Sequence, residues 1–123
     1  MSKAQFLKDN LQPGEVYAGL ILGEGGEKDY HLILLPQTVP STTWQKAKAW
    51  AKSVGGALPD RRELRLLWVN AKQEFEDAWY WSSETHASLS DCAWMQDFGS
   101  GSQHGYGRKD TTFRARAVRR LAI

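Results

Sequence analysis

The side chains able to do acid–base, nucleophilic or metal chemistry gather in the second half of the chain. His86 and His104 could supply imidazole ligands to a metal, and Asp91 or Asp97 could add a carboxylate. Cys92 could pair with either histidine as nucleophile and base. However, the spacing of these residues matches no compact ligand motif, and no catalytic signature surrounds Cys92. The sequence therefore predicts no metal, no cofactor and no enzymatic activity.

Recognition is the chemistry that the polar segments of this half favour. "ETHASLSD" (84–91) and "GSGSQHGYGRKDTT" (99–112) are rich in Gly, Ser, His and Tyr, the composition of many recognition loops. We expect a ligand surface between Glu84 and Thr112, with plain solvated loops as the alternative. Tyr106 and Arg108 are the main expected anchors, because Tyr and Arg are frequent binding hot spots. The predicted ligand-binding residues are Tyr80, Glu84, His86, Gln96, Asp97, Gln103, His104, Tyr106 and Arg108.

The aromatic run "WYWSS" precedes these segments and has the character of a strand. Alternation along a strand places Trp79 and Trp81 on one face and Tyr80 on the other. We expect Trp81 to enter the core and the opposite face to be presented to solvent, where Tyr80 could contact a ligand.

The C-terminal segment is basic. Six basic residues, Arg108, Lys109, Arg114, Arg116, Arg119 and Arg120, lie between positions 108 and 120 against the single acid Asp110. Arg114, Arg119 and Arg120 could grip nucleic acid, but no aromatic residues interleave with the arginines and the net charge is only +2. A structural role for these arginines is the favoured interpretation.

Length and composition predict one globular domain over residues 1–123, with 41% hydrophobic and 24% charged residues. A single cysteine rules out an internal disulfide and suits a reducing compartment. No apolar signal core or membrane-spanning run is present in the sequence. We therefore expect a cytoplasmic protein of a bacterium, or one assembled into a phage particle, without membrane contact.

The elements that must position the recognition residues follow from periodicity. Two β-rich runs at about 16–36 predict a hairpin, after which the spacing of Trp44, Ala47 and Ala51 predicts a helix. Thr42 and Gln45 could form a capping box for this helix, and Gly55 would end it.

A second helix is predicted from Asp60 as N-cap, with Glu63 three residues on. These two acids are needed for capping, so they are poor candidates for a catalytic pair. The apolar stripe of this second helix is Leu64, Leu67, Trp68 and Ala71. Short strands at "WYWSSE", "CAWMQDF" and "FRARAVRRL" are expected to form a twisted antiparallel sheet with long polar loops, which completes an α+β chain.

Residues 43–121 resemble the DUF1566 family, also called the Lcl C-terminal domain family. The resemblance is carried by "TWQKAKAWAKSVGG", "ALPDRRELRLLW", "YWSS", "AWMQDF" with a following glycine, and "RAVRR", in that order. It implies a C-type-lectin-like fold, related to the formylglycine-generating-enzyme type of that fold. Such domains are known mainly as ligand-binding scaffolds, some of which phages or bacteria display. One collagen-like adhesin of the family binds sulfated glycans.

Departures from related families limit what the resemblance implies. The chain lacks the Glu-Pro-Asn triplet of calcium-dependent sugar binders, and Cys92 stands alone where the formylglycine-generating enzymes have two active-site cysteines. Neither a lectin calcium site nor that enzyme chemistry is therefore implied. By resemblance, Arg116 and Arg119 are expected to tie the last strand to acidic or backbone groups of the fold.

Two functions follow. The first is a non-enzymatic recognition module of phage or prophage origin that binds a protein or glycan through the loops 84–112. The second is an intracellular regulatory or inhibitor protein that docks on a host protein or nucleic-acid complex through its Arg-rich C-terminal edge. A second copy of the chain is a further candidate partner.

Overall fold

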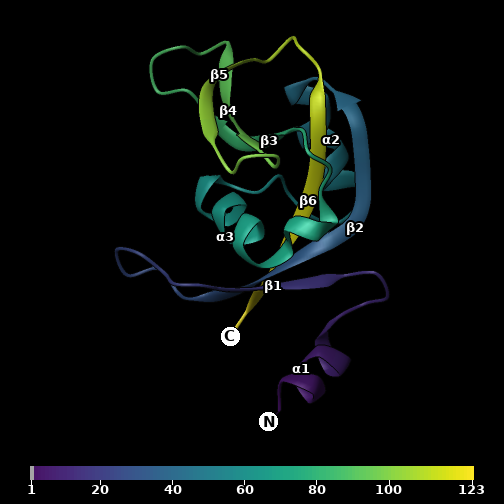
Figure 1. Cartoon of the computed structure of the whole chain (residues 1–123). Coiled ribbons are helices and arrows are strands. Elements are labelled where there is room, and N and C mark those ends of the chain that lie inside the picture. Colours follow the sequence, from purple (N-terminus) through teal and green to yellow (C-terminus); the bar gives the residue numbers. More distant parts are fainter. Residues whose placement is uncertain (1) are drawn as a thin grey trace.

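The structure is a computed structural model that describes residues 2–123, and it has a mixed α+β fold with three α-helices and a six-stranded sheet (Figure 1). In chain order the elements are α1 (Lys3–Asn10), β1 (Val16–Ile21), β2 (Tyr30–Thr42), α2 (Trp44–Ser53), α3 (Arg61–Ala71), the 3-10 helix η1 (Lys72–Glu74), β3 (Trp79–Thr85), β4 (Cys92–Asp97), β5 (Gln103–Arg108) and β6 (Phe113–Ala122).

The strands lie side by side in the order β1-β2-β6-β3-β4-β5, so β1 and β5 are the two edges. The predicted N-terminal hairpin is confirmed as β1 and β2, although β2 continues past Pro36 to Thr42. The expectation of an antiparallel sheet holds for every pair except β3 and β6, which run parallel through Tyr80 and Arg114. The last strand thus joins the N-terminal hairpin to the strands that carry the predicted site.

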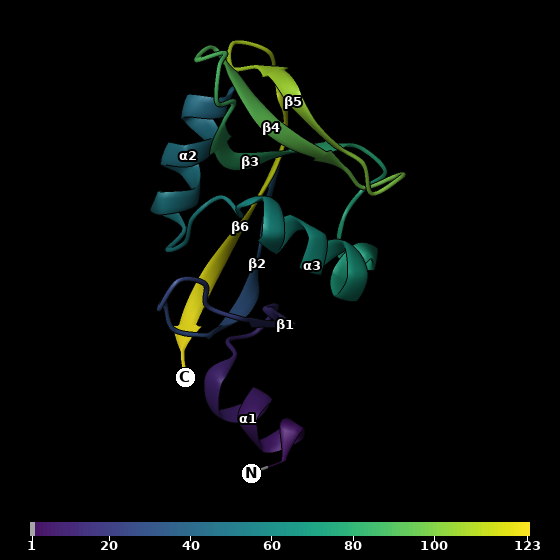
Figure 2. The same cartoon turned by 90° about the vertical axis from the view of Figure 1, so that its left-hand side faces the viewer.

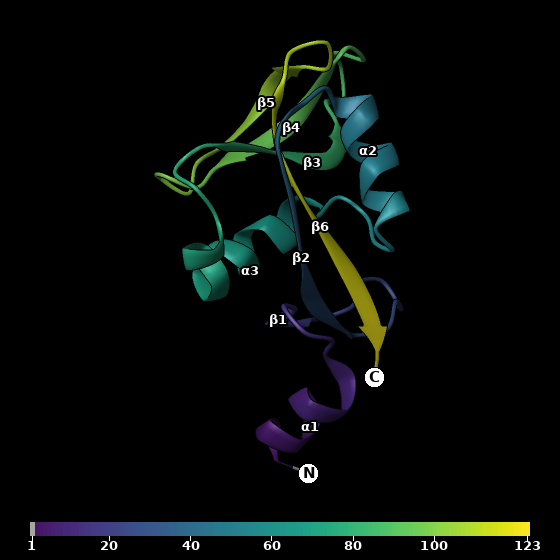
Figure 3. The same cartoon turned by 90° about the vertical axis from the view of Figure 1, so that its right-hand side faces the viewer.

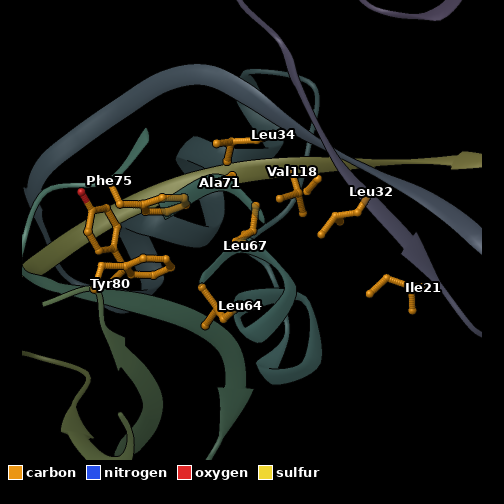
Figure 4. Packing of buried hydrophobic residues seen from close by; sticks show 11 residues of the cluster. Ile21, Leu32, Leu34, Leu64, Leu67, Ala71, Phe75, Tyr80 and Val118 are labelled. Carbon is orange, nitrogen blue, oxygen red and sulfur yellow. The ribbon is translucent and has the colours of Figure 1, made fainter. Parts of the chain in front are cut away.

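Helices α2 and α3 lie on opposite sides of β6 (Figures 2 and 3). Alternation along the central strands supplies an apolar face to each helix. Val118 packs with Leu64 and Leu67 of α3, whereas Ala117 packs with Ala47 of α2. The α3 side is the cluster in Figure 4, where Leu32, Leu34 and Val118 of the sheet meet α3. Both faces of the central sheet are therefore core.

The two long helices begin and end differently from one another. At α3 the predicted capping box is confirmed, because Glu63 N donates to the Asp60 side chain and Asp60 N donates to Glu63. At α2 the predicted capping box is wrong, since Thr43 is the N-cap and the buried Thr42 hydroxyl donates to the Thr43 carbonyl. Gly55, at φ 88°, ends α2 as predicted.

The aromatic run of β3 does not present a face to solvent. Trp81 is fully buried as expected, and its indole N–H donates to Thr42 O at 2.8 Å. Tyr80 is only 2% exposed, so the expectation that it faces a ligand is wrong. Its ring packs against Phe75 and Phe98, and its hydroxyl accepts from Glu76 N at 3.0 Å. The expectation failed because β3 lies inside the sheet, where α3 and its 3-10 extension cover the second face.

The expected polar loops at 84–112 contain more regular structure than predicted. The strand β4 was expected, but β5 lies in the stretch that its glycines and serines assigned to a loop. Helix α1 was also not among the predicted elements; its Phe6 ring lies 4.6 Å from the His31 ring and 5.4 Å from the Tyr17 ring. Among residues 2–123, no helix has the length and apolar character needed to cross a membrane.

Candidate functional site

A polar hollow of about 310 Å³ lies where the start of α3 meets the end of β3 and the start of β5. Its volume is at the lower end of the range for small-ligand pockets. The lining residues are Asp60, Arg61, Arg62, Arg65, Glu84 and Gln103. We call it the arginine hollow, because three of these six residues are arginines.

Arg61 is the most firmly positioned side chain of the arginine hollow. Its guanidinium lies 3.5 Å from the centre of the Trp94 ring, and its Nε donates to Gln103 Oε1 at 3.1 Å. The two terminal nitrogens of Arg61 make no hydrogen bond to any residue from 2 to 123. A planar guanidinium held on a ring with its outer nitrogens free is prepared for a bidentate acceptor, such as a carboxylate.

Gln103 positions Arg61, and Gln96 in turn positions Gln103. Gln103 Nε2 donates to Arg61 O at 2.8 Å and to Gln96 Oε1 at 2.9 Å. Gln96 in turn donates to Leu64 O at 2.8 Å and is fully buried. The prediction that Gln96 contacts a ligand is therefore wrong, because its amide is used to join β4 to α3. Gln103, half-buried, lines the hollow but has both amide atoms engaged.

The carboxylates of the hollow are engaged with the helix start. Glu84 Oε2 accepts from Arg61 N at 2.7 Å, and Asp60 Oδ1 accepts from Glu63 N at 2.8 Å. Burial raises the pKa of Asp60 above its usual value, against the opposing effect of the Glu63 N–H. These two acids hold the N-terminus of α3 with one carboxylate oxygen each, and the three arginines of the lining outnumber them.

Four rings gather beside the hollow: His86, Trp94, His104 and Tyr106, which we call the ring cluster. The His86 ring lies 6.2 Å from Trp94 with its plane tilted by only 10°, and 5.1 Å from Tyr106. His104 lies 5.1 Å from Tyr106. The exposed fraction of Tyr106 is 59%, so its ring is open to a partner.

Glycine and backbone contacts fix the geometry of the ring cluster. A Cβ at Gly105 would lie 3.0 Å from both His86 and Trp94, so glycine lets these rings lie close to β5. His86 Nδ1 accepts from Ser88 N and Leu89 N, which places the imidazole proton on Nε2. The loop after β3 is thus folded around His86.

Two predicted residues lie apart from this arrangement. Asp97 accepts from Gly99 N and from the Ser100 hydroxyl, and so it holds the turn between β4 and β5. Arg108 is exposed at the far end of β5 and pairs with Asp110 at 3.3 Å. The structure therefore brings together Glu84, His86, Gln103, His104 and Tyr106, but not the other four predicted residues.

The C-terminal arginines are engaged within the fold. Arg116 donates to Leu35 O at 2.8 Å and to Glu74 O, and Arg119 pairs with Glu15 at 2.8 Å. The expected role of these two arginines in tying down the last strand is confirmed. Arg120 pairs with Glu63 at 2.7 Å. Of the three arginines considered for nucleic acid, only Arg114 makes no ion pair with residues 2–123.

Sequence reasoning missed Arg61, Arg65 and Trp94. The first two are four positions apart on a predicted helix, which places them on one side of it. Trp94 is two positions before Gln96 and so shares its strand face. Helical spacing and strand alternation therefore contained the signals for these three residues. The apolar stripe of the helix and the strand pattern, however, indicate only which residues enter the core.

Within the described residues, no three His, Cys, Asp or Glu side chains gather as metal ligands, and Cys92 is a buried free thiol. No protein-family model matches the chain, and no curated protein matches it either. The resemblance to the DUF1566 family stays a prediction.

Proposed function

We propose that the chain is a non-enzymatic recognition module that binds a protein or a glycan through the surface formed by the arginine hollow and the ring cluster. The observation that carries the proposal is that Arg61, held on the Trp94 ring, lies beside the ring cluster that contains the exposed Tyr106. Aromatic rings offer a large contact area at little conformational cost, and a stacked arginine adds directional donors.

The proposal includes a C-type-lectin-like fold, which the resemblance implies. The pairing of β6 with β2 of the N-terminal hairpin, and the two helices between hairpin and site, support it. A phage or prophage setting is also part of the proposal and rests on the resemblance alone. The alternative, an inhibitor that docks through its basic edge, has less support, because Arg119 and Arg120 are paired within the chain.

A pull-down from bacterial lysate with the wild type and with Tyr106→Ala tests the proposal. Each captured partner is then titrated by calorimetry. We expect Tyr106→Ala to weaken binding about tenfold, which equals about 1.4 kcal/mol. Its stability should change by less than about 0.5 kcal/mol, because the ring is largely exposed.

Lys46→Ala is the control, because Lys46 is exposed on α2, on the other side of the sheet. A partner that binds Tyr106→Ala and Arg61→Gln as tightly as the wild type would contradict the proposal. Binding lost only on replacement of Arg114 would favour the basic-edge alternative.

A further inference from the structure

A second hollow adjoins the arginine hollow across α3. It has a volume of about 340 Å³ and lies between the edge strand β1 and α3. Arg62 and Arg65 line both hollows, so the two form one surface. The remaining lining of the second hollow is apolar: Leu20, Ile21, Leu22, Leu66 and Val69. We call it the apolar groove.

Three side chains of the apolar groove are open to solvent. Leu20 is 42% exposed, Leu22 is 59% exposed and Val69 is 73% exposed. Single exposed apolar residues are common, but three that line one groove form a patch of the kind found at interaction sites. A partner that buries these side chains would remove apolar surface from contact with water, which favours binding.

The charges around the two hollows determine which partner fits. Arg65 makes no hydrogen bond or ion pair with residues 2–123, and the terminal nitrogens of Arg61 are also unused there. Arg62, by contrast, is engaged with Leu22 O at 2.9 Å and Glu24 at 2.9 Å. The acids of the arginine hollow bind the backbone of α3. Asp60 and Glu84 each use only one carboxylate oxygen on that backbone, so two acids share the hollow with three arginines. The hydrogen-bond donors left without a partner among residues 2–123 are those of Arg61 and Arg65, and they suit an anionic acceptor.

We propose that the two hollows together bind an acidic, apolar segment of a protein. An Asp or Glu side chain of the partner enters the arginine hollow between Arg61 and Arg65, and a large apolar side chain fills the groove beside Val69. This inference rests on the proposed recognition function and narrows the ligand from protein or glycan to protein.

A protein fits both hollows better than a glycan does. The apolar groove offers no side-chain acceptor for sugar hydroxyls, so a glycan would leave Leu22 and Val69 uncovered. Arg, Tyr and Trp, all present around the arginine hollow, are also the residues enriched in protein interfaces.

The helix sets the spacing of the two partner side chains. Arg65 and Val69 are four positions apart on α3, which corresponds to about 6 Å along the axis, and Arg61 lies about 6 Å further. An extended segment advances about 3.3 Å per residue. The partner's acidic and apolar residues should therefore be about two to four positions apart.

Selection from a random peptide display library with the full chain as bait tests the inference. The enriched peptides are synthesised with their acid intact and with that acid changed to its amide. We expect an Asp or Glu two to four positions from a large apolar residue. Loss of the carboxylate, Arg65→Gln and Val69→Gln should each weaken binding about tenfold. Lys46→Gln, which removes a positive charge from α2, should have no effect.

The variants are chosen to leave the fold intact. Arg65 has no partner among the described residues, and glutamine is a better helix former than valine at the exposed position 69. Thermal unfolding of each variant confirms this before binding is measured. If Val69→Gln lowers the melting temperature, Leu22→Gln replaces it, because Leu22 lies on the other wall of the groove.

The remaining outcomes contradict the inference. It fails if no peptide is enriched, or if the enriched peptides bind Arg65→Gln and Val69→Gln as tightly as the wild type. It also fails if a glucuronate oligosaccharide, titrated in parallel, binds at the arginine hollow while no peptide does. Binding that depends on Tyr106 but not on Arg65 or Val69 would leave the recognition function standing and refute only this inference.

Discussion

Glu63 connects the start of α3 to the C-terminal strand, and Glu63→Gln is the sharpest test of how this fold is held together. Its fully buried carboxylate accepts from Arg120 Nε and Nη2 at 2.7 Å each and from the Tyr30 hydroxyl at 2.6 Å. It also accepts from Asp60 N at 2.8 Å within the capping box. Glutamine has the same shape but carries no charge and brings an amide toward a guanidinium.

The cost of Glu63→Gln follows from these contacts. Removing one partner of a buried ion pair costs about 3–5 kcal/mol. The Arg120 side chain is 38% exposed, so solvent can rehydrate it and screens the pair. The lower end, about 3 kcal/mol, is therefore expected. For a chain of this length that loss corresponds to a fall of about 12 °C in melting temperature.

The pH dependence provides a second readout. Burial would raise the pKa of Glu63, but hydrogen bonds from Arg120 and Tyr30 outweigh burial and hold that pKa below its usual value. This contribution to stability is fully present above the unfolded pKa of about 4.3 and is lost as the pH falls through the lower folded-state pKa. Glu63→Gln should remove this acid-sensitive component.

Arg120→Met should reverse the sign of the contribution. Without the guanidinium, we expect burial, which is the largest single influence on this carboxyl, to outweigh the remaining hydrogen bonds from Tyr30 and Asp60 N and to raise the pKa of Glu63 above its unfolded value. The contribution is then greatest below about pH 4 and falls as the pH rises through the folded-state pKa. As the pH falls from 7 to 5, the free energy of unfolding of this variant should therefore rise relative to that of the wild type.

Urea unfolding of the wild type, both single variants and the double variant at about pH 7, pH 5 and pH 3 measures these effects, because the wild-type contribution is lost only below the unfolded pKa of about 4.3. The double-mutant cycle should give a coupling of about 2 kcal/mol at pH 7. A coupling below about 0.5 kcal/mol, together with the same pH slope in all four proteins, would refute the reasoning.

Three further changes have defined outcomes. Trp81→Ala should lower the free energy of unfolding in urea by about 3–5 kcal/mol, because the ring is fully buried and the hydrogen bond from its N–H to Thr42 O is lost. A decrease below about 1 kcal/mol would show that Trp81 is not part of the core. Gly105→Ala should cost about 1–3 kcal/mol and change tryptophan fluorescence, because the His86 and Trp94 rings must move to admit the methyl group; unchanged fluorescence would contradict the packing described. Arg116→Met should lower stability by about 2 kcal/mol, because it removes the donors to Leu35 O and Glu74 O, and calorimetry should show unchanged partner binding.

Local patterns predicted most of the elements. The capping box at Asp60 and the glycine stop at Gly55 involve neighbours in the sequence, so their signals are contained in a few residues. Thr42 failed as a cap because it is the last residue of β2, where it pairs with Phe113 of the distant strand β6, so that Thr43 becomes the N-cap. β5 was missed because its glycines weaken any strand signal. They are required by neighbours from other parts of the chain: the His86 and Trp94 rings lie against Gly105, and Met95 lies against Gly107.

The candidate site was predictable in part for the same reason. Tyr106 and Glu84 have polar neighbours and were identified from composition. Tyr80 and Gln96 were placed wrongly, because their burial depends on α3 and its 3-10 extension, which cover one face of β3 and β4. The alternation of residues along a strand indicates that its two faces differ, but it does not indicate whether other elements cover both faces.

NMR shift mapping of a bound partner tests the central claim most directly. The account predicts the largest shifts at the indole N–H of Trp94 and the amides of Arg61, Arg65 and Tyr106, around the arginine hollow and the ring cluster. Shifts confined to α2, or to the segment around Arg114, with these signals unmoved would contradict it.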